Sequence, residues 1–431
     1  MNETDTIREL HQMLLASTSP YHCIKESSRR LLEAGFEPLT LSAPWNVIPG
    51  RSYYVNVYDS TLAAFSISET LGETPFLRIA ASHTDWPCLK IKPSPEVTSG
   101  RYGKLNVEVY GGPILSTWLD RPLSMAGKLC LKGENPFQPE VRFVDFKRPV
   151  LTIPNLAIHM NREVNNGVAL KVQSDMLPLL TIINDALNKD HYFLDLLAKE
   201  ADVSPDDILD FEICIYNDDE GTQLGLDNEF FSAPRLDNIT SVQACLKGII
   251  NSRPKQGINV IALYDNEEIG SRTKQGASST LMEHLLEKLY LSLGLTKEAL
   301  LNSLWSGYLL SLDVAHAVHP NHSEKCDIKN QVYLNDGFCL KLASSQAYAT
   351  DSAAVGVIES ICADHQIAYK KFSNNSDIKG GSTLGSISSA CLGIRTIDAG
   401  VPILAMHSAR EVMGIRDQEA LEAVTRCFFN A

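Results

Sequence analysis

The stretch INVIALYDNEEIGS, residues 258–271, joins an apolar run directly to a run of polar groups. The apolar part, 258–264, has the length and composition of a buried strand. The polar residues that follow it are Asp265, Asn266, Glu267 and Glu268. Adjacent carboxylates repel each other, so enclosing them is costly unless cations neutralise them. The stretch therefore predicts either a polar surface turn or a cation site at the end of a strand.

Other apolar runs of strand length recur along the chain, at 52–58, 76–82, 307–313 and 393–399. Amphipathic helical patterns lie at 4–16, 20–34, 239–251, 278–293 and 353–367. Alternation of strands and helices is typical of an α/β fold, in which helices cover the faces of a central, mostly parallel sheet. We therefore predict that fold class for the two ends of the chain.

The middle of the chain has a different pattern. Between about 90 and 228 the residues alternate as in strands, for example in KLNVEVYGGP (104–113), and turn-rich stretches separate these segments. We therefore predict an inserted, β-rich second domain at 90–228. It interrupts a first domain made of 1–89 and 229–431.

Composition excludes several classes of function. The 431 residues carry a formal net charge of −14, which argues against a nucleic-acid partner. We expect no membrane span, because no run of 18 apolar residues occurs, and no signal peptide, because the N-terminus lacks a basic and apolar leader. The ten cysteines include no CxxC pair, which favours a reduced, cytoplasmic protein over a disulfide framework or a cysteine zinc site.

Residue types that bind metals or move protons lie next to the predicted strands and helices of the α/β part. Open α/β sheets place their ligand crevice at the carboxyl ends of the strands, so residues far apart in the chain are expected to converge there. The candidates are His83, Asp85, Asp237, Glu267, Glu268, Asp313 and His407.

Five of these candidates match the needs of two zinc ions that share a bridging carboxylate: His83, Asp237, Glu268, Asp313 and His407. Imidazole nitrogen and carboxylate oxygen are ordinary zinc ligands. Two Zn²⁺ against three carboxylates leave one positive charge, which favours hydroxide over water, and zinc lowers the pKa of its water to about 7. Co²⁺ and Mn²⁺ are possible substitutes at such sites.

The two remaining candidates have supporting roles. Glu267 is predicted to be the general base, because the neighbouring Glu268 is used as a ligand. Asp85 is suited to accept the second imidazole N–H of His83 and so to fix its tautomer. The histidines of AHAVHPNH, at 316, 319 and 322, offer a competing set of ligands, against the simpler interpretation of a polar loop.

Several long motifs, in order, resemble the aspartyl aminopeptidase family of dinuclear-zinc metallopeptidases. They include SHTDWPCLKIKP, FFSAPRLDNITS, DNEEIGSRTKQGASS, LDVAHAVHPN and GVPILAMHSARE, and the similarity spans nearly the whole chain. The resemblance implies a zinc-exopeptidase-like catalytic domain with an inserted dimerisation domain. It also implies dimers that assemble into a tetrahedral dodecamer.

Carried over by position, the resemblance assigns a role to each ligand. His83 and Asp313 hold one zinc, and Glu268 and His407 hold the other. Asp237 bridges the two ions.

The resemblance also implies three substrate-binding residues. His159, in the LAIH motif, reaches the active site of a neighbouring subunit, and Lys341 and Tyr348 line the substrate pocket. From the residues alone, Lys341 could instead extend to the surface, because it lies in the apolar stretch GFCLKLA.

The implied activity is the release of N-terminal acidic residues, Asp or Glu, from peptides. Trp86, Ala347 and 374–377 depart from the family pattern, and the last two lack the usual cation. An aminopeptidase of the same clan with broad or neutral specificity is therefore the first alternative. An inactive assembly scaffold is the second, although the ligands and the base are all present.

Overall fold

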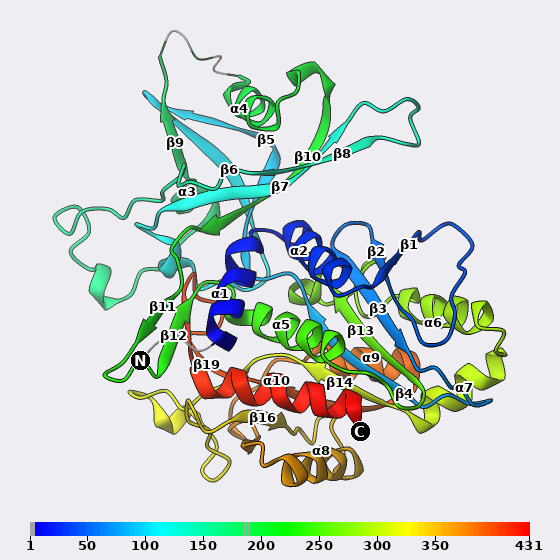
Figure 1. Ribbon diagram of the computed structural model, residues 1–431. Helices are drawn as coiled ribbons and strands as arrows, with labels where there is room; N and C mark the ends of the chain where they lie inside the picture. Colours follow the sequence, from blue (N-terminus) through cyan, green and yellow to red (C-terminus); the bar gives the residue numbers. More distant parts are fainter. Residues whose placement is uncertain (1–4, 185–186, 188–189) are drawn as a thin grey trace. The chain divides into compact units, whose positions relative to one another are not determined.

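The computed structural model describes residues 5–184, 187 and 190–431 and divides into two compact units (Figure 1). The first unit comprises Met1–Asp85, Gly221–Met406 and Glu411–Ala431. The second unit comprises Trp86–Glu220 and His407–Arg410. Each unit has its own sheet, so each is described separately.

The first unit is built on a nine-stranded mixed sheet, which confirms the predicted α/β class. In sheet order its strands are β1 (Glu37–Leu39), β2 (Ser52–Val57), β3 (Thr61–Ile67), β13 (Ile258–Tyr264), β4 (Leu77–His83), β14 (Tyr308–Leu312), β18 (Arg395–Gly400), β16 (Phe338–Lys341) and β17 (Tyr369–Phe372). Strands β2, β4, β13, β14 and β18 correspond to the five predicted apolar runs. The parallel neighbours β13, β4, β14 and β18 occupy the centre.

Strand β13 is buried along its whole length, as its unbroken apolar sequence requires. Because side chains alternate between the faces of a sheet, its residues divide between two helix layers. Val260, Ala262 and Tyr264 belong to a core cluster that includes residues of α6 (Leu281–Ser292) and α9 (Leu384–Leu392). The opposite face of the sheet is covered by α5 (Leu236–Ile250), which contacts β4 and β13.

The remaining helices of the first unit are α1 (Asp5–Ala16), α2 (Pro20–Glu33), α7 (Lys297–Ser306), α8 (Ser352–His365) and α10 (Ile415–Asn430). The start of α2 follows its sequence signal, because Ser19 accepts a hydrogen bond from the His22 N–H and Pro20 is the first helical residue. The sequence analysis did not anticipate α7, α9 or α10. The last packs against α5, where Thr425 and Phe429 lie beside Gly248.

A five-stranded sheet completes the first unit: β11 (Thr222–Leu224), β12 (Phe230–Ala233), β20 (Glu411–Gly414), β19 (Pro402–Leu404) and β15 (Ala315–His316). The short 3₁₀ helices of the described residues are η1 (Leu115–Trp118), η2 (Val164–Asn166), η3 (Pro205–Asp207), η4 (Glu267–Ile269) and η5 (Ser323–Lys325). Each described helix is too short or too polar to cross a membrane.

The second unit is an antiparallel sheet of six strands. In order they are β8 (Glu140–Asp145), β7 (Leu123–Leu131), β10 (Ile208–Asn217), β5 (Cys88–Ser99), β6 (Tyr102–Tyr110) and β9 (Leu179–Ile182), with helices α3 (Val172–Asp175) and α4 (Tyr192–Ala201). Leu105 and Val107 of β6 are buried while their neighbours are more exposed, which is the pattern of a sheet covered on one face.

A buried carboxylate holds the start of α10 in the first unit. Asp417 is fully enclosed and accepts hydrogen bonds from the backbone N–H groups of Asn335 and Gly337, both at 2.8 Å. Burial raises the pKa of Asp417 to about 7, against the lowering effect of these hydrogen bonds. The folded protein therefore prefers the protonated form.

The substitution Asp417→Asn is expected to remove a pH dependence of stability. Between pH 4 and pH 7 the unfolded chain ionises Asp417 while the folded chain keeps it protonated, so wild-type stability falls as pH rises through this window. Relative to wild type, the variant should gain up to about 1 kcal/mol per pH unit there. Urea unfolding of both proteins at pH 5, 6 and 7 measures the difference, and a difference independent of pH would contradict the assignment.

Candidate functional site

Three parallel strands of the first unit deliver polar residues to one edge of the sheet. His83 is the last residue of β4, and in the register of the sheet it lies opposite Tyr264, the last residue of β13. Glu267 and Glu268 follow β13 in η4, and Asp313 follows β14 directly. Parallel strands end at the same edge, so the topology brings these groups together.

The four polar residues after β13 have two different functions. Asp265 accepts a hydrogen bond from the N–H of Asn266 (2.7 Å), and Asn266 adopts a left-handed conformation and accepts one from the Thr273 hydroxyl (2.9 Å). These two residues build the turn. Glu267 and Glu268 come next, and both are part of clusters of potential metal ligands.

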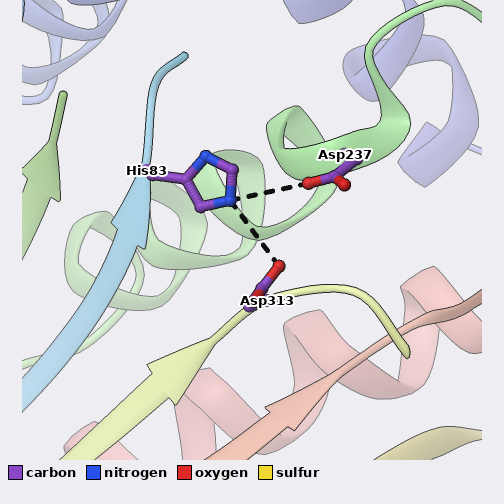
Figure 2. A group of neighbouring side chains, drawn as sticks. All are labelled: His83, Asp237 and Asp313. Atoms are coloured by element: carbon purple, nitrogen blue, oxygen red, sulfur yellow. Dashed lines mark ion pairs between the residues drawn. The ribbon is translucent and has the colours of Figure 1, made fainter. Parts of the chain in front are cut away.

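His83 is the centre of the site. Its Nε2 lies 3.5 Å from Oδ1 of Asp237 and 3.6 Å from Oδ1 of Asp313, as Figure 2 shows. Asp237 comes from the irregular first turn of α5, where its peptide bond to Asn238 is cis. The sequence analysis expected these three residues to converge, and in the structure they lie side by side.

A second cluster shares His83 and adds Glu267 and Glu268. In each cluster the possible ligand atoms lie within 4.8 Å of one another. Five of the seven residues proposed for the metal site and its chemistry therefore meet at one edge of the first unit, although they are up to 230 positions apart in the chain.

Asp85 fixes the loop that carries the two glutamates. Its carboxylate oxygens accept hydrogen bonds from the backbone N–H groups of Glu267 and Glu268, both at 3.1 Å. For His83 Nδ1 the nearest partner is the Asp85 carbonyl oxygen at 3.0 Å, and the carboxylate is at 3.5 Å. The closest contact of Asp85 with the histidine is thus made by its backbone carbonyl and not, as had been expected, by the carboxylate. The carboxylate holds η4, which the sequence did not indicate.

The charges in the site oppose one another strongly. Burial, together with the charges of Asp313, Asp85 and Asp237, raises the pKa of Glu267 to about 8, although His83 lowers it. Burial and the charge of Asp237 raise the pKa of Glu268 well above its usual value. A cation bound among these acids would therefore displace protons from them.

Asp313 behaves differently, because it has a cationic neighbour. Burial raises the pKa of Asp313, but the Lys341 ammonium and His83 outweigh burial and hold it well below the usual range. Lys341 is only 2% exposed, so the interpretation that it extends to the surface is wrong. Its Nζ lies 5.0 Å from the centre of the Tyr348 ring, and Tyr348 is itself buried.

The other two residues of the predicted site belong to the second unit. His407 has its Nδ1 3.1 Å from the carbonyl oxygen of Gly112. His159 is exposed in a turn between β8 and α3. Neither belongs to the sheet that ends at His83.

The competing histidine set does not gather into a ligand cluster. Across the described residues, the clusters of potential metal ligands omit His316, His319 and His322. These three histidines instead line a pocket of about 490 Å³, which also includes Lys325 and Phe372.

The structure also reveals supporting residues that the sequence analysis missed. Glu411 accepts a hydrogen bond from the backbone N–H of Asp237 at 3.0 Å, and the Asn238 amide donates to the Leu312 carbonyl at 2.9 Å. Both contacts fix the backbone beside a proposed ligand. Their positions in the motifs SARE and RLDN were the only available signal.

The residues present fit zinc. Zinc binds nitrogen and oxygen at about 2.0–2.2 Å in tetrahedral sites, so two of its ligands lie about 3.4 Å apart. The separations of 3.5 and 3.6 Å around His83 Nε2 are close to this value. A cation among these carboxylates would also relieve the repulsion that raises the pKa of Glu267 and Glu268.

Comparison with known proteins gives a consistent result. The family model for "Aminopeptidase I zinc metalloprotease (M18)" matches residues 13–429. A probable M18 family aminopeptidase 2 from Clostridium novyi is 42% identical over 430 residues, covering 100% of this chain and 99% of that protein.

Solved structures agree with this match. The cryo-EM structure of the Ape4 and Nbr1 complex aligns with a TM-score of 0.93 and 31% identity, covering 98% of this chain and 85% of that one. The S. cerevisiae mApe1 dodecamer aligns with a TM-score of 0.86 and 26% identity, covering 99% and 96%. The chain therefore belongs to the M18 family of zinc metallo-aminopeptidases, the aspartyl aminopeptidases that its motifs resemble.

Proposed function

We propose that this aminopeptidase hydrolyses the first peptide bond of its substrates with two zinc ions per subunit. The observation that carries the proposal is the close approach of Asp237 and Asp313 to Nε2 of His83, with Glu267 and Glu268 in an overlapping cluster. Buried acids at such density are costly without cations.

The assignment of ligands follows the sequence and is part of the proposal. His83 and Asp313 would hold one ion, Glu268 and His407 would hold the other, and Asp237 would be shared by both. The assignment of His83 and Asp313 is supported by the distance between them, whereas the assignment of His407 depends on the sequence motif around it. Co²⁺ or Mn²⁺ could replace zinc at such nitrogen and oxygen ligands.

Glu267 is the proton carrier in this proposal. Zinc, when bound, lowers the pKa of water to about 7 and polarises the scissile carbonyl. Two cations would also lower the pKa of Glu267 from about 8, because they cancel the charges of Asp313 and Asp237. The ionised Glu267 then takes a proton from the attacking water and gives it to the leaving amine.

We also propose a preference for N-terminal Asp or Glu. The 490 Å³ pocket of the first unit supports it, because the described residues that line the pocket include His319, His322, Lys325 and Lys379 but no carboxylate. Phe372 of this pocket packs against Tyr348, a proposed substrate contact. Ala347, in place of a cation, supports the alternative of broad or neutral specificity.

The assembly is proposed by analogy with the solved relatives. The mApe1 structure is a dodecamer. We propose a homo-oligomer of the same kind, made of dimers arranged as a tetrahedron, in which the second unit is the dimerisation domain. His159, exposed in its turn, would then reach the active site of a neighbouring subunit. The ten cysteines of the chain are free thiols, which agrees with the proposal of a reducing, cytoplasmic location.

The substitution Glu267→Gln should abolish most turnover while leaving zinc bound. Gln is nearly isosteric with Glu but cannot accept the proton, so kcat should fall by about 10²–10⁴-fold. Hydrolysis of an aminoacyl reporter and metal analysis of the purified variant measure the two effects. The control is Glu283→Gln on α6, since Glu283 belongs to neither cluster. Wild-type activity in the Glu267 variant would exclude this residue as the base.

The substitution Asp85→Asn should weaken zinc binding. The two backbone N–H groups of η4 bind separate oxygens of Asp85, and in Asn one of these oxygens becomes an NH2 group, which donates and cannot accept. The loop carrying Glu268 therefore loses one of its two hydrogen bonds to position 85. We expect about a 10–100-fold loss of zinc affinity in competition with a chelator. Asp59→Asn, in the turn between β2 and β3, is the matched control. If Asp85→Asn binds zinc as tightly as the wild type, the hydrogen bonds from η4 to Asp85 have no effect on zinc binding.

Reporter substrates with N-terminal Asp, Glu, Ala, Leu and Lys test the specificity. We expect kcat/KM for Asp or Glu to exceed that for Ala and Leu by at least about tenfold, because an ion pair formed away from water outweighs the contact of a small apolar side chain. If Leu or Ala is the best substrate, the acidic preference is wrong and the broad-specificity alternative holds.

A further inference from the structure

We propose that Lys341 is a positioning residue, which holds the zinc ligand Asp313 in place and does not recognise the substrate. The inference rests on the proposed function, because Asp313 is a ligand only in that scheme. It changes the role that the sequence resemblance implies for Lys341.

The ammonium group of Lys341 contacts three oxygen atoms of the segment that follows β14. Its Nζ lies 2.9 Å from the carbonyl oxygen of Val314, 3.1 Å from the carbonyl oxygen of Asp313 and 3.4 Å from Oδ2 of the Asp313 carboxylate. An ammonium has three N–H donors. Each donor therefore has an oxygen acceptor within the protein.

These contacts determine how Asp313 faces the site. Oδ2 points at Lys341, whereas Oδ1 lies 3.6 Å from Nε2 of His83. One oxygen is thus engaged with the ammonium and the other is directed to the cluster. The arrangement favours binding of a metal through a single oxygen of Asp313.

The main chain beside the ligand is fixed from both sides. The N–H of Asp313 donates to the carbonyl of Ala399 on β18 at 2.9 Å, and its carbonyl oxygen receives the Lys341 ammonium. Because Lys341 ends β16, the ligand is tied to two neighbouring strands of the sheet. Removal of the ammonium would release one of these ties.

The surroundings of Lys341 leave little room for a substrate carboxylate. The side chain is 2% exposed, and the ring of Tyr348 lies 5.0 Å from Nζ in a cation–π arrangement. Burying an ammonium is costly unless it is paired, and Asp313 supplies the pairing charge. A substrate acid would have to displace Asp313, which is itself required by the metal.

The test is Lys341→Met, which keeps an unbranched side chain of nearly the same length but removes its charge and donors. Zinc affinity is measured for both sites by competition with a chelator, and kcat/KM is measured for Glu and Ala reporters. We expect about a 10–100-fold loss of affinity at one of the two zinc sites. The Glu-to-Ala ratio of kcat/KM at saturating zinc should stay within about twofold of wild type.

Lys288→Met is a matched control. Lys288 also donates to two backbone carbonyls, those of Leu41 and Ala43 at 2.7 Å each, and also stands over an aromatic ring, that of Trp45. It contacts no proposed ligand. The Lys288→Met variant should therefore keep the wild-type zinc affinity, even if its melting temperature falls.

Each result decides the inference. Unchanged zinc affinity in Lys341→Met, or a tenfold fall in the Glu-to-Ala ratio, would overturn it. If the Met variant does not fold, Lys341→Arg decides: its planar fork keeps the charge but cannot meet all three oxygens, so weaker zinc binding supports the inference and wild-type binding refutes it. A wild-type protein that binds fewer than two zinc ions would instead refute the proposed function.

Discussion

Repulsion between enclosed carboxylates is the constraint on which this site depends. Five acids, Asp85, Asp237, Glu267, Glu268 and Asp313, gather around His83 at one edge of the sheet. Unless cations neutralise these enclosed acids, some of them must be protonated. The raised pKa values of Glu267 and Glu268 reflect this free-energy cost of enclosing several negative charges together. The proposed zinc ions would bind tightly to these acids, because each carboxylate would then lie near a positive charge and its repulsion from the others would be offset.

The protein also distributes its own compensating groups unequally. Asp85 is held by two backbone N–H groups, whereas Asp313 is held by the Lys341 ammonium. Glu267 has no comparable cation among its named partners, apart from His83. This difference suits their proposed roles. A ligand such as Asp313 and a supporting residue such as Asp85 need a fixed orientation, while a base must be able to gain and lose a proton.

The rigid frame behind the site explains its precision. Strands β4, β13 and β14 are buried and parallel. His83 ends β4, Asp313 directly follows β14, and Glu267 follows β13 after a turn of two residues. The turn that carries His159 is exposed and belongs to the second unit. Residues for chemistry thus stand on the sheet, and a residue proposed to serve a neighbouring subunit stands on a loop.

The sequence by itself determined the α/β class, five strands of the main sheet and the identity of the clustered residues, because apolar runs and the polar residues after them are local features. It did not show that Asp265 and Asn266 only build the turn, since all four residues of DNEE are equally polar. It missed the hydrogen bonds between Asp85 and η4, the helix α10 and the burial of Lys341 against Asp313. Those depend on contacts between segments far apart in the chain, so only the tertiary structure, which decides what each polar atom meets, could assign them.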